Sequence, residues 1–122
     1  MNYKFEWIDN NPIVTFEGDI SFDDIFHIDG KIYGDSRFDL IKYIIYNFLE
    51  VKNLNLSALE MKAISYIDKS ASRGNEKIKF AIVIQDNLIK KVILDYMTLM
   101  LDSSWEIEYF NTVDKALDWC KK

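Results

Sequence analysis

Two patterns of hydrophobic and polar residues alternate along the chain, one typical of strands and the other of helices. The segment Tyr3–Ile8 ("YKFEWI") alternates apolar with polar residues, and Ile13–Gly18 follows it after the turn residues "DNNP". Together they predict an antiparallel hairpin. Two nearly unbroken apolar runs, Tyr43–Leu49 and Ile78–Ile84, have the composition of strands that are buried on both faces.

Apolar residues recur at helical spacing in four further segments. Ser21 is positioned to begin the first helix and Gly34 to end it, whereas Ser57 and Glu60 form the capping box of the second. Thr112 begins the last one. The apolar faces of the four predicted helices consist of Phe22, Ile25, Phe26, Ile32 and Tyr33; of Met61, Ile64, Ile67 and Ala71; of Leu88, Ile89, Val92, Ile93, Tyr96, Met97 and Met100; and of Val113, Ala116, Leu117 and Cys120.

The segment Trp105–Phe110 alternates again, and Glu106 and Glu108 lie on its polar side, as in an edge strand. The element order is therefore β-β-α-β-α-β-α-β-α, which predicts one α/β domain over residues 1–122. We expect a single mixed, mostly parallel five-stranded sheet with helices mainly on one face. The apolar runs 43–49 and 78–84 are expected side by side in its middle.

Composition and charge narrow the function classes. Hydrophobic residues make up 49% of the chain and aromatic residues 15%, which is enough for a packed core. Residues 1–61 carry 5 lysines and arginines against 11 aspartates and glutamates, which argues against a nucleic-acid partner. No apolar run approaches the roughly 20 residues that a membrane helix needs. The start of the chain lacks the apolar core of a signal peptide, so a reducing cytoplasm is the expected location.

Motifs that carry chemistry are absent. No glycine-rich phosphate loop occurs, and a single histidine, His27, and a single cysteine, Cys120, give no metal site. His27 is expected to be exposed, and Cys120 to lie in or near the core. An enzyme would need a cleft with two convergent acids, or His27 beside a nucleophile. We therefore predict no enzymatic activity, no cofactor and no metal.

A contact face is expected where the parallel strands end, because ligands and partners of such sheets meet the loops at that edge. The loops Glu50–Ser57 and Gln85–Asn87 follow the two most buried strands. They carry the uncharged hydrogen-bonding side chains that we predict to form a partner or ligand face: Asn53, Asn55, Ser57, Gln85 and Asn87.

Two features of this region allow more than one interpretation. Ser57 is either a helix cap or a phosphorylation site, and the cap is favoured because Glu60 lies close and would repel a phosphate. The apolar stripe of the third helix is wide, and it either packs within the domain or forms a surface for a dimer partner or an apolar ligand. The residues of that possible surface are Ile89, Ile93, Met97 and Met100.

Over nearly its whole length the chain resembles the SpoIIAA-like branch of the STAS superfamily (sulfate transporter and anti-sigma factor antagonist). The resemblance is carried by "VTFEGDISFDDI", "DSRFDLIKYIIYNF", "KIKFAIVI" and the ending "EYFNTVDKALDWCKK", with Ala116, Leu117 and Trp119 at the family's Ala-Leu-x-Trp positions. It implies a small cytoplasmic bacterial protein that binds other proteins. Some STAS domains are switched by a phosphoserine at the start of the second helix, which here is Ser57. The usual Asp-Ser-Ser/Thr-Gly element is replaced by Asn55-Leu56-Ser57-Ala58-Leu59.

The sequence thus predicts a non-enzymatic regulatory or interaction module that binds a protein partner or itself as a homodimer. The alternative is a carrier or sensor of a small apolar, lipid-like ligand held beneath the third helix.

Overall fold

The computed structural model describes residues 2–122 and follows the predicted element order. Its elements are β1 (Tyr3–Ile8), β2 (Asn11–Ser21), α1 (Phe22–Tyr33), a 3-10 turn (Phe38–Leu40), β3 (Tyr43–Asn55), α2 (Ala58–Gly74), β4 (Lys79–Val83), α3 (Asn87–Leu99), β5 (Glu106–Phe110) and α4 (Val113–Cys120).

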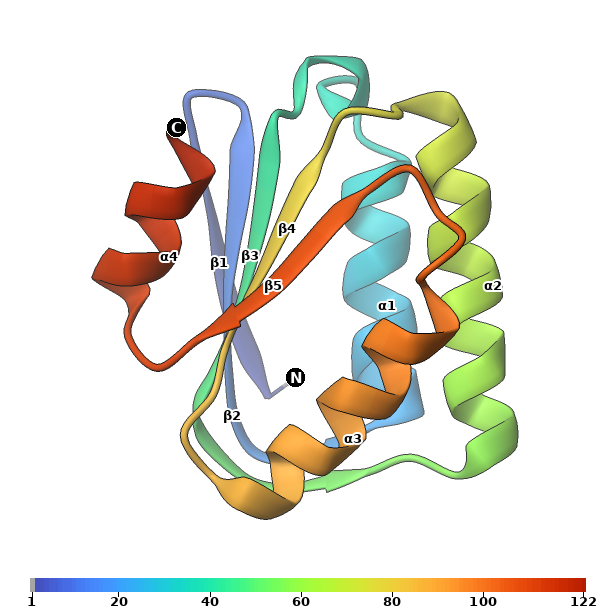
Figure 1. The fold of residues 1–122 in the computed structure, drawn as a ribbon, viewed down its shortest axis with the longest axis vertical. Coiled ribbons are helices and arrows are strands. Elements are labelled where there is room, and N and C mark those ends of the chain that lie inside the picture. Colours follow the sequence, from blue (N-terminus) through green and yellow to red (C-terminus); the bar gives the residue numbers. More distant parts are fainter. Residues whose placement is uncertain (1) are drawn as a thin grey trace.

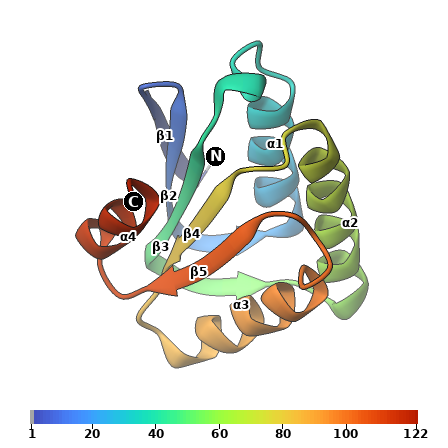
Figure 2. The same cartoon turned by 45° about the horizontal axis from the view of Figure 1, so that its top comes forward.

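The five strands lie in the sheet in the same order as in the chain, β1-β2-β3-β4-β5. The β1–β2 pair is antiparallel, and the other pairs are parallel. Tyr43 pairs with Lys79 and Asn47 with Val83, so the two apolar runs are neighbours, as predicted. Helices α1, α2 and α3 cover one face of the sheet, whereas α4 lies alone on the other (Figures 1 and 2).

Two strands are longer than the sequence predicted. The first is β2, which runs over Asn11–Ser21 and so extends beyond Ile13–Gly18 at both ends. The segment Glu50–Asn55 continues β3 and is not a loop. It pairs with Glu17–Ser21 of β2, across two register shifts, and Gly18 takes a φ of 72°, a conformation that suits glycine. Its polar sequence resembles a loop because one side of this two-stranded extension faces solvent, while Val51 remains buried on the other.

The helix ends follow the predicted caps. The Ser57 hydroxyl accepts a hydrogen bond from the Glu60 N–H (3.1 Å), and the Glu60 carboxylate accepts one from the Ser57 N–H (2.9 Å). At the start of α4 the Thr112 hydroxyl accepts a hydrogen bond from the Lys115 N–H at 3.2 Å. The prediction for Phe26 is wrong, because this side chain is 52% exposed and stacks on Phe22 at the surface.

The sheet separates two apolar cores. The helix-side core, between the sheet and α1–α3, is the larger and contains most of the aromatic residues. The α4-side core is small. It consists of Ile13, Tyr43, Ile45, Ala81, Val83, Ala116 and Cys120.

Candidate functional site

Two carboxyl groups lie deep inside the helix-side core. Asp29 of α1 is 1% exposed and Asp68 of α2 is 2% exposed. Three tyrosines surround them: Tyr33 of α1, Tyr46 of β3 and Tyr96 of α3. We call these five residues the acid–tyrosine cluster. None of the five was predicted to form a site from the sequence.

Tyrosine hydroxyls satisfy most of the carboxyl oxygens. Tyr33 donates to Asp68 Oδ1 at 2.7 Å and Tyr96 donates to Asp68 Oδ2 at 2.5 Å. Tyr46 donates to Asp29 Oδ1. Asp29 Oδ2 is buried and has no donor among the described residues. The cluster therefore links all three helices of this face to the central strand β3.

The two carboxyl groups differ in how well they can hold a negative charge. Burial, followed by the negative charge of Asp68, raises the pKa of Asp29 well above its usual value. Burial also raises the pKa of Asp68, but the hydrogen bonds from Tyr33 and Tyr96 oppose that shift. A proton on Asp29 lets this residue donate to Asp68 and gives its second oxygen a partner. The cluster is thus satisfied when it holds one proton on Asp29 and one negative charge on Asp68.

A small cavity of about 40 Å³ adjoins the cluster. Asp68, Tyr46 and Tyr96 line part of it, and the remaining lining is apolar. The apolar lining residues are Ile25, Phe48, Leu54, Leu56, Met61, Ile64, Phe80, Ile82 and Ile93. This volume has room for about three water molecules, which is less than a lipid or even a benzene ring requires.

The cluster meets one criterion for an enzyme, since two acids converge, but its geometry does not favour catalysis. The acids are sealed from solvent, and tyrosines occupy all but one of their oxygens. His27, the other candidate, is exposed as predicted, and its ring lies 6.3 Å from that of Tyr3. The arrangement is suited to holding a proton and tying helices together.

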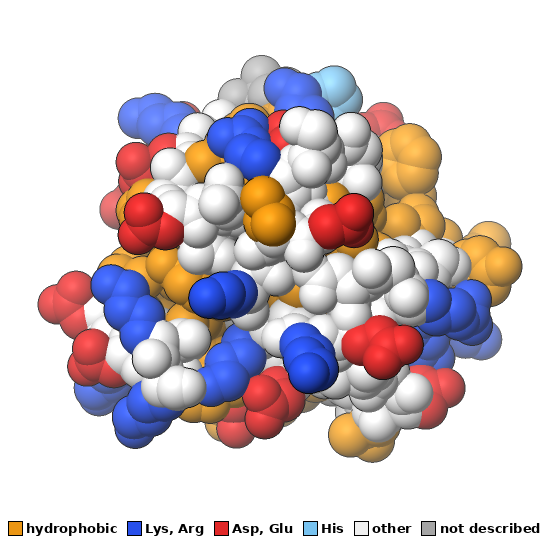
Figure 3. All heavy atoms as spheres, turned by 90° about the horizontal axis from the view of Figure 1, so that it is seen from above, with side chains coloured by type: hydrophobic (Ala, Val, Ile, Leu, Met, Phe, Trp, Pro, Cys, Tyr) orange, Lys and Arg blue, Asp and Glu red, His pale blue; other side chains and the backbone are white. Residues whose placement is uncertain are grey.

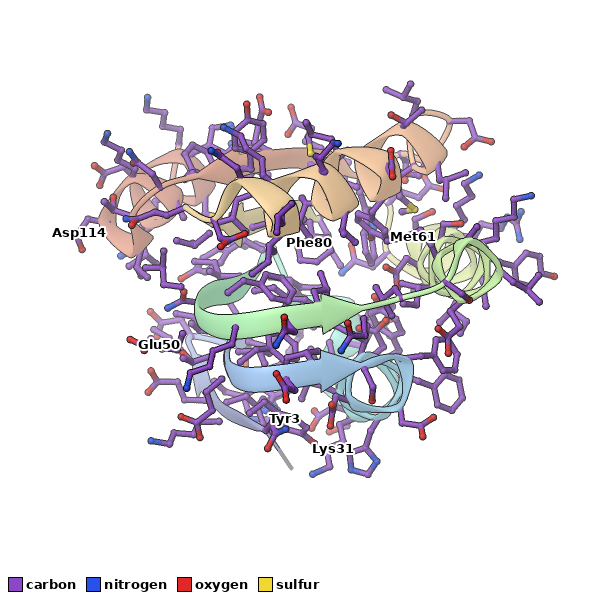
Figure 4. All side chains as sticks on the ribbon, turned by 90° about the horizontal axis from the view of Figure 1, so that it is seen from below. Tyr3, Lys31, Glu50, Met61, Phe80 and Asp114 are labelled. Carbon is purple, nitrogen blue, oxygen red and sulfur yellow. The ribbon has the colours of Figure 1, made fainter. Side chains whose placement is uncertain are left out.

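The predicted partner face lies at the end of the sheet where β2, β3 and β4 finish, and Figure 4 looks onto this end. We call it the carboxyl-end face and define it by Asn53, Asn55, Ser57, Gln85 and Asn87, all of which are exposed. Charged side chains of both signs are interspersed on the opposite end, shown in Figure 3.

Several polar groups of this face already have partners within the fold. Asn53 donates to Asp19 Oδ1 at 2.8 Å, Gln85 donates to the carbonyl oxygen of Asn111 at 2.8 Å, and Ser57 caps α2. The β3 extension separates the two segments more than the sequence suggests, because β3 continues eight residues beyond Asn47, its last position paired with β4.

A surface hollow of about 410 Å³ opens between the start of α2 and α3. Ser57 lines it, and so do apolar and charged side chains of both helices. These are Leu56, Ala58, Met61, Lys62, Val92, Asp95, Thr98 and Leu99. Leu59 and Leu88, at the first turns of α2 and α3, are 78% and 76% exposed. This end of the molecule thus combines exposed leucines with a hollow of mixed polarity.

The apolar stripe of α3 divides between two environments. Ile89 and Ile93 are buried in the helix-side core. Met100 is also buried in that core, at 2% exposed, and with Met97 it lines a second groove of about 250 Å³ beside Trp105 and Ile107. These four residues thus lie partly in the core and partly along this groove, and a joint surface for a dimer partner or an apolar ligand stays a prediction.

The single cysteine lies where the sequence predicted. Cys120 is 8% exposed in the α4-side core, and burial raises its pKa to about 11. No group of three or more metal-ligating side chains occurs in residues 2–122. Within the same residues, no helix has the length and apolar character needed to cross a membrane.

A weak signal for the buried acids was present in the sequence. Asp29 lies one residue after the inward-facing Ile28, and Asp68 lies four residues after Ile64 on the inner face of α2. A charged residue at an inward position of an amphipathic helix indicates a partner. The sequence does not reveal which residues these partners are, because the donors lie in three different elements.

No family model matches the chain, and no curated protein matches it. Solved structures do resemble it. A candidate anti-sigma factor antagonist from Thermotoga maritima superposes with a TM-score of 0.66 at 14% identity, over 98% of this chain and 95% of that chain. The anti-sigma factor antagonist SpoIIAA in its unphosphorylated form gives 0.65 at 12% identity, over 98% and 97% of the two chains.

An uncharacterised protein from Shewanella loihica with a SpoIIAA-like fold gives a TM-score of 0.55 at 16% identity, over 97% of this chain and 91% of that chain. With identities this low, the likeness concerns the fold alone. The chain has the SpoIIAA-like α/β fold, as its sequence predicted.

Proposed function

We propose that this chain is a non-enzymatic regulatory module of the bacterial cytoplasm that binds a protein partner through its carboxyl-end face. The single observation that carries the proposal is the hollow of about 410 Å³ between α2 and α3, lined by Ser57 and flanked by the exposed Leu59. Exposed apolar side chains beside polar groups are typical of surfaces that bind other proteins.

The structural neighbours support the same class of function. Two of them are described as anti-sigma factor antagonists, or candidates for that role, and such proteins act on other proteins. The sealed acids of this chain give no access for a substrate, which favours a binding role over a catalytic one.

A matched pair of leucine variants tests the face. Leu59→Glu places a charge beside the hollow, whereas Leu40→Glu makes the same change at a comparably exposed leucine in the 3-10 turn. The tagged wild-type protein and both variants are expressed in the organism that naturally makes the protein and are purified from it. Co-purifying proteins are quantified by mass spectrometry. We expect at least one stoichiometric partner to be lost with Leu59→Glu and retained with Leu40→Glu. Equal retention by both variants contradicts the proposed face.

For Ser57 we propose a structural cap and not a phosphorylation site. Its hydroxyl is occupied by the Glu60 N–H, and the Glu60 carboxylate returns to the Ser57 N–H. A phosphate would bring negative charge against that carboxylate. Intact-mass measurement of the protein from its own cells tests this, because a mass increase of one phosphate that maps to Ser57 contradicts the cap.

Carriage of a small apolar ligand remains a second candidate, favoured by the apolar cavity beneath α3. A lipid would require α3 to move outward, since about 40 Å³ is too small for an acyl chain. Native mass spectrometry of the same sample separates the two functions: a co-purified small-molecule mass supports the carrier, and a protein complex supports the module.

A further inference from the structure

The outer edge of β5 carries main-chain groups that pair with nothing in the sheet. The Glu106 N–H donates to the Ile78 carbonyl at 3.3 Å, and the Phe110 carbonyl accepts from the Ile84 N–H at 2.9 Å. The main chain of these residues therefore faces β4. Because alternate residues of a strand direct their N–H and C=O groups to opposite sides, those of Ile107 and Tyr109 point away from the sheet. No strand of residues 2–122 lies beyond them.

An apolar groove runs beside this open edge. It has a volume of about 250 Å³, and its lining comes from α3, from the turn after α3 and from the start of β5. Leu94 and Leu101 are 43% and 81% exposed, and Ile107 contributes from β5. Met97 and Thr98 also line it, and the nearly buried Met100 and Trp105 form its floor. A strand placed on the edge of β5 would direct every second side chain over this groove.

The opposite face of β5 presents negative charge. Glu106 and Glu108 are exposed and make no ion pair within the described part of the chain. Lys79 of β4 is the register neighbour of Glu106. Its ammonium group does not contact the glutamate but donates to the Trp119 carbonyl oxygen at 3.1 Å. Both carboxylates are therefore available to a residue directly opposite them on an added strand.

We propose that the edge of β5 binds an extended peptide segment in which apolar and basic residues alternate. The segment adds to β5 as a new outer strand, its main chain pairing with Ile107 and Tyr109. Its apolar side chains cover the groove beside α3, and its lysines or arginines lie opposite Glu106 and Glu108. This surface is separate from the carboxyl-end face, and either one can fail without the other.

The same charges argue against a second copy of the chain as the occupant. In an antiparallel pair of two β5 strands centred on Glu108, the two Glu108 side chains would lie opposite each other, which is unfavourable. The other exposed edge, β1, offers Lys4 and Glu6 at alternate positions, so when these two residues lie opposite Glu106 and Glu108, Glu6 faces a like charge. A segment with two basic residues in register satisfies both carboxylates.

Synthetic peptides test the proposal on the intact chain. The probe is a capped heptapeptide that alternates valine with lysine, titrated to millimolar concentration against isotope-labelled protein while amide NMR shifts are recorded. We expect shifts at residues 105–111 and at residues 94–101, which span the end of α3 and the turn after it. Two N-methylated versions provide the control: methyl groups on the amides that face β5 abolish binding, and methyl groups on the alternate amides do not.

Charge reversal provides an independent test. In the double variant Glu106→Lys with Glu108→Lys, we expect about tenfold weaker binding of the lysine peptide and a gain of binding by the valine–glutamate peptide. The absence of binding at millimolar peptide overturns the proposal, and so do shifts confined to β1 or the carboxyl-end face. Equal binding of both N-methylated peptides overturns it as well. Protein that dimerises through residues 106–110 without peptide shows that a second copy is the occupant.

Discussion

The helix-side core and the α4-side core lie against the same central strands, but they are stabilised in different ways. On the helix side, two buried carboxyl groups and three tyrosines join α1, α2, α3 and β3, and a small cavity remains beside them. On the α4 side, the packing relies on small residues, with Ala81 and Ala116 both fully buried, and no buried carboxyl group.

The difference shows what each side requires from its residues. Three helices meet on one side, and hydrogen bonds with fixed partners define their relative positions, although burying the charge on Asp68 has a cost. A single helix approaches the other side closely, and alanine permits that approach. The following experiments test the contrast.

The largest effect is expected for Asp68→Ala. The change leaves the Tyr33 and Tyr96 hydroxyls without an acceptor in a buried site and removes the acceptor for the Asp29 proton. We expect a loss of about 3 to 5 kcal/mol in the free energy of unfolding. Urea denaturation measures it. Asp102→Ala, which breaks the exposed ion pair with Lys69, is the control and should change stability little. Similar stability of both variants would show that the cluster does not hold the helices.

The pH dependence of stability comes next. Burial, then the charge of Asp68, raises the pKa of Asp29 above the value of 3.8 expected for the unfolded chain. The folded state therefore keeps a proton that the unfolded state loses, so this contribution is complete below about pH 4 and declines as the pH rises toward the folded-state pKa. The decline is at most about 1.4 kcal/mol per pH unit.

Asp29→Asn isolates that contribution. The asparagine can accept from Tyr46 and donate to Asp68 as a protonated Asp29 does, but it cannot ionise. We expect the variant to fold and to lose less stability than the wild type between pH 5 and pH 8 in urea denaturation. If stability depends on pH in the same way in both proteins, the group that keeps the extra proton in the folded state is not Asp29.

Overpacking of the α4-side core is expected to have an intermediate effect. Ala81→Leu adds three carbon atoms where β4 meets α4, in a site with no exposed surface. We expect a loss of about 1 to 3 kcal/mol, measured by thermal or urea unfolding. Ala58→Leu, at an exposed position in the first turn of α2, should be close to neutral. If Ala81→Leu leaves the stability unchanged, α4 can shift on the sheet to make room for the larger side chain.

The smallest effect is expected for Cys120→Ser, at the border of the α4-side core. The exchange replaces a weakly polar thiol with a hydroxyl that is less favourable in an apolar site, at a cost of about 1 kcal/mol or less. In the folded wild type, burial and a pKa raised to about 11 keep Cys120 poorly reactive. Its alkylation rate at pH 8 should therefore rise on unfolding in urea. Rapid alkylation of the native protein would show that α4 detaches.

Sequence patterns predicted the fold well because most of it depends on local signals. Neighbouring residues were enough to predict the buried runs at β3 and β4, the capping box at Ser57 and the alternation in β5. The β3 extension was missed because its polar residues find their partner in β2, more than thirty positions away, as in the hydrogen bond from Asn53 to Asp19.

The functional features were harder to predict for the same physical reason. The acid–tyrosine cluster joins residues from four elements, and each residue alone has an ordinary alternative role. The groove beside β5 depends on how far α3 lies from the sheet edge, which periodicity does not report. Met97 and Met100 were recognised as surface candidates, but their neighbours Trp105 and Ile107 were not.

The strand order has a consequence for synthesis of the protein. Because β1 to β5 are neighbours in the order in which they leave the ribosome, each new strand finds its partner already made and adds to an open edge. First β3 offers such an edge to β4, and β4 then offers one to β5. After β5 the chain forms α4, and no later strand of the described residues covers the edge of β5, which stays available as the earlier edges were.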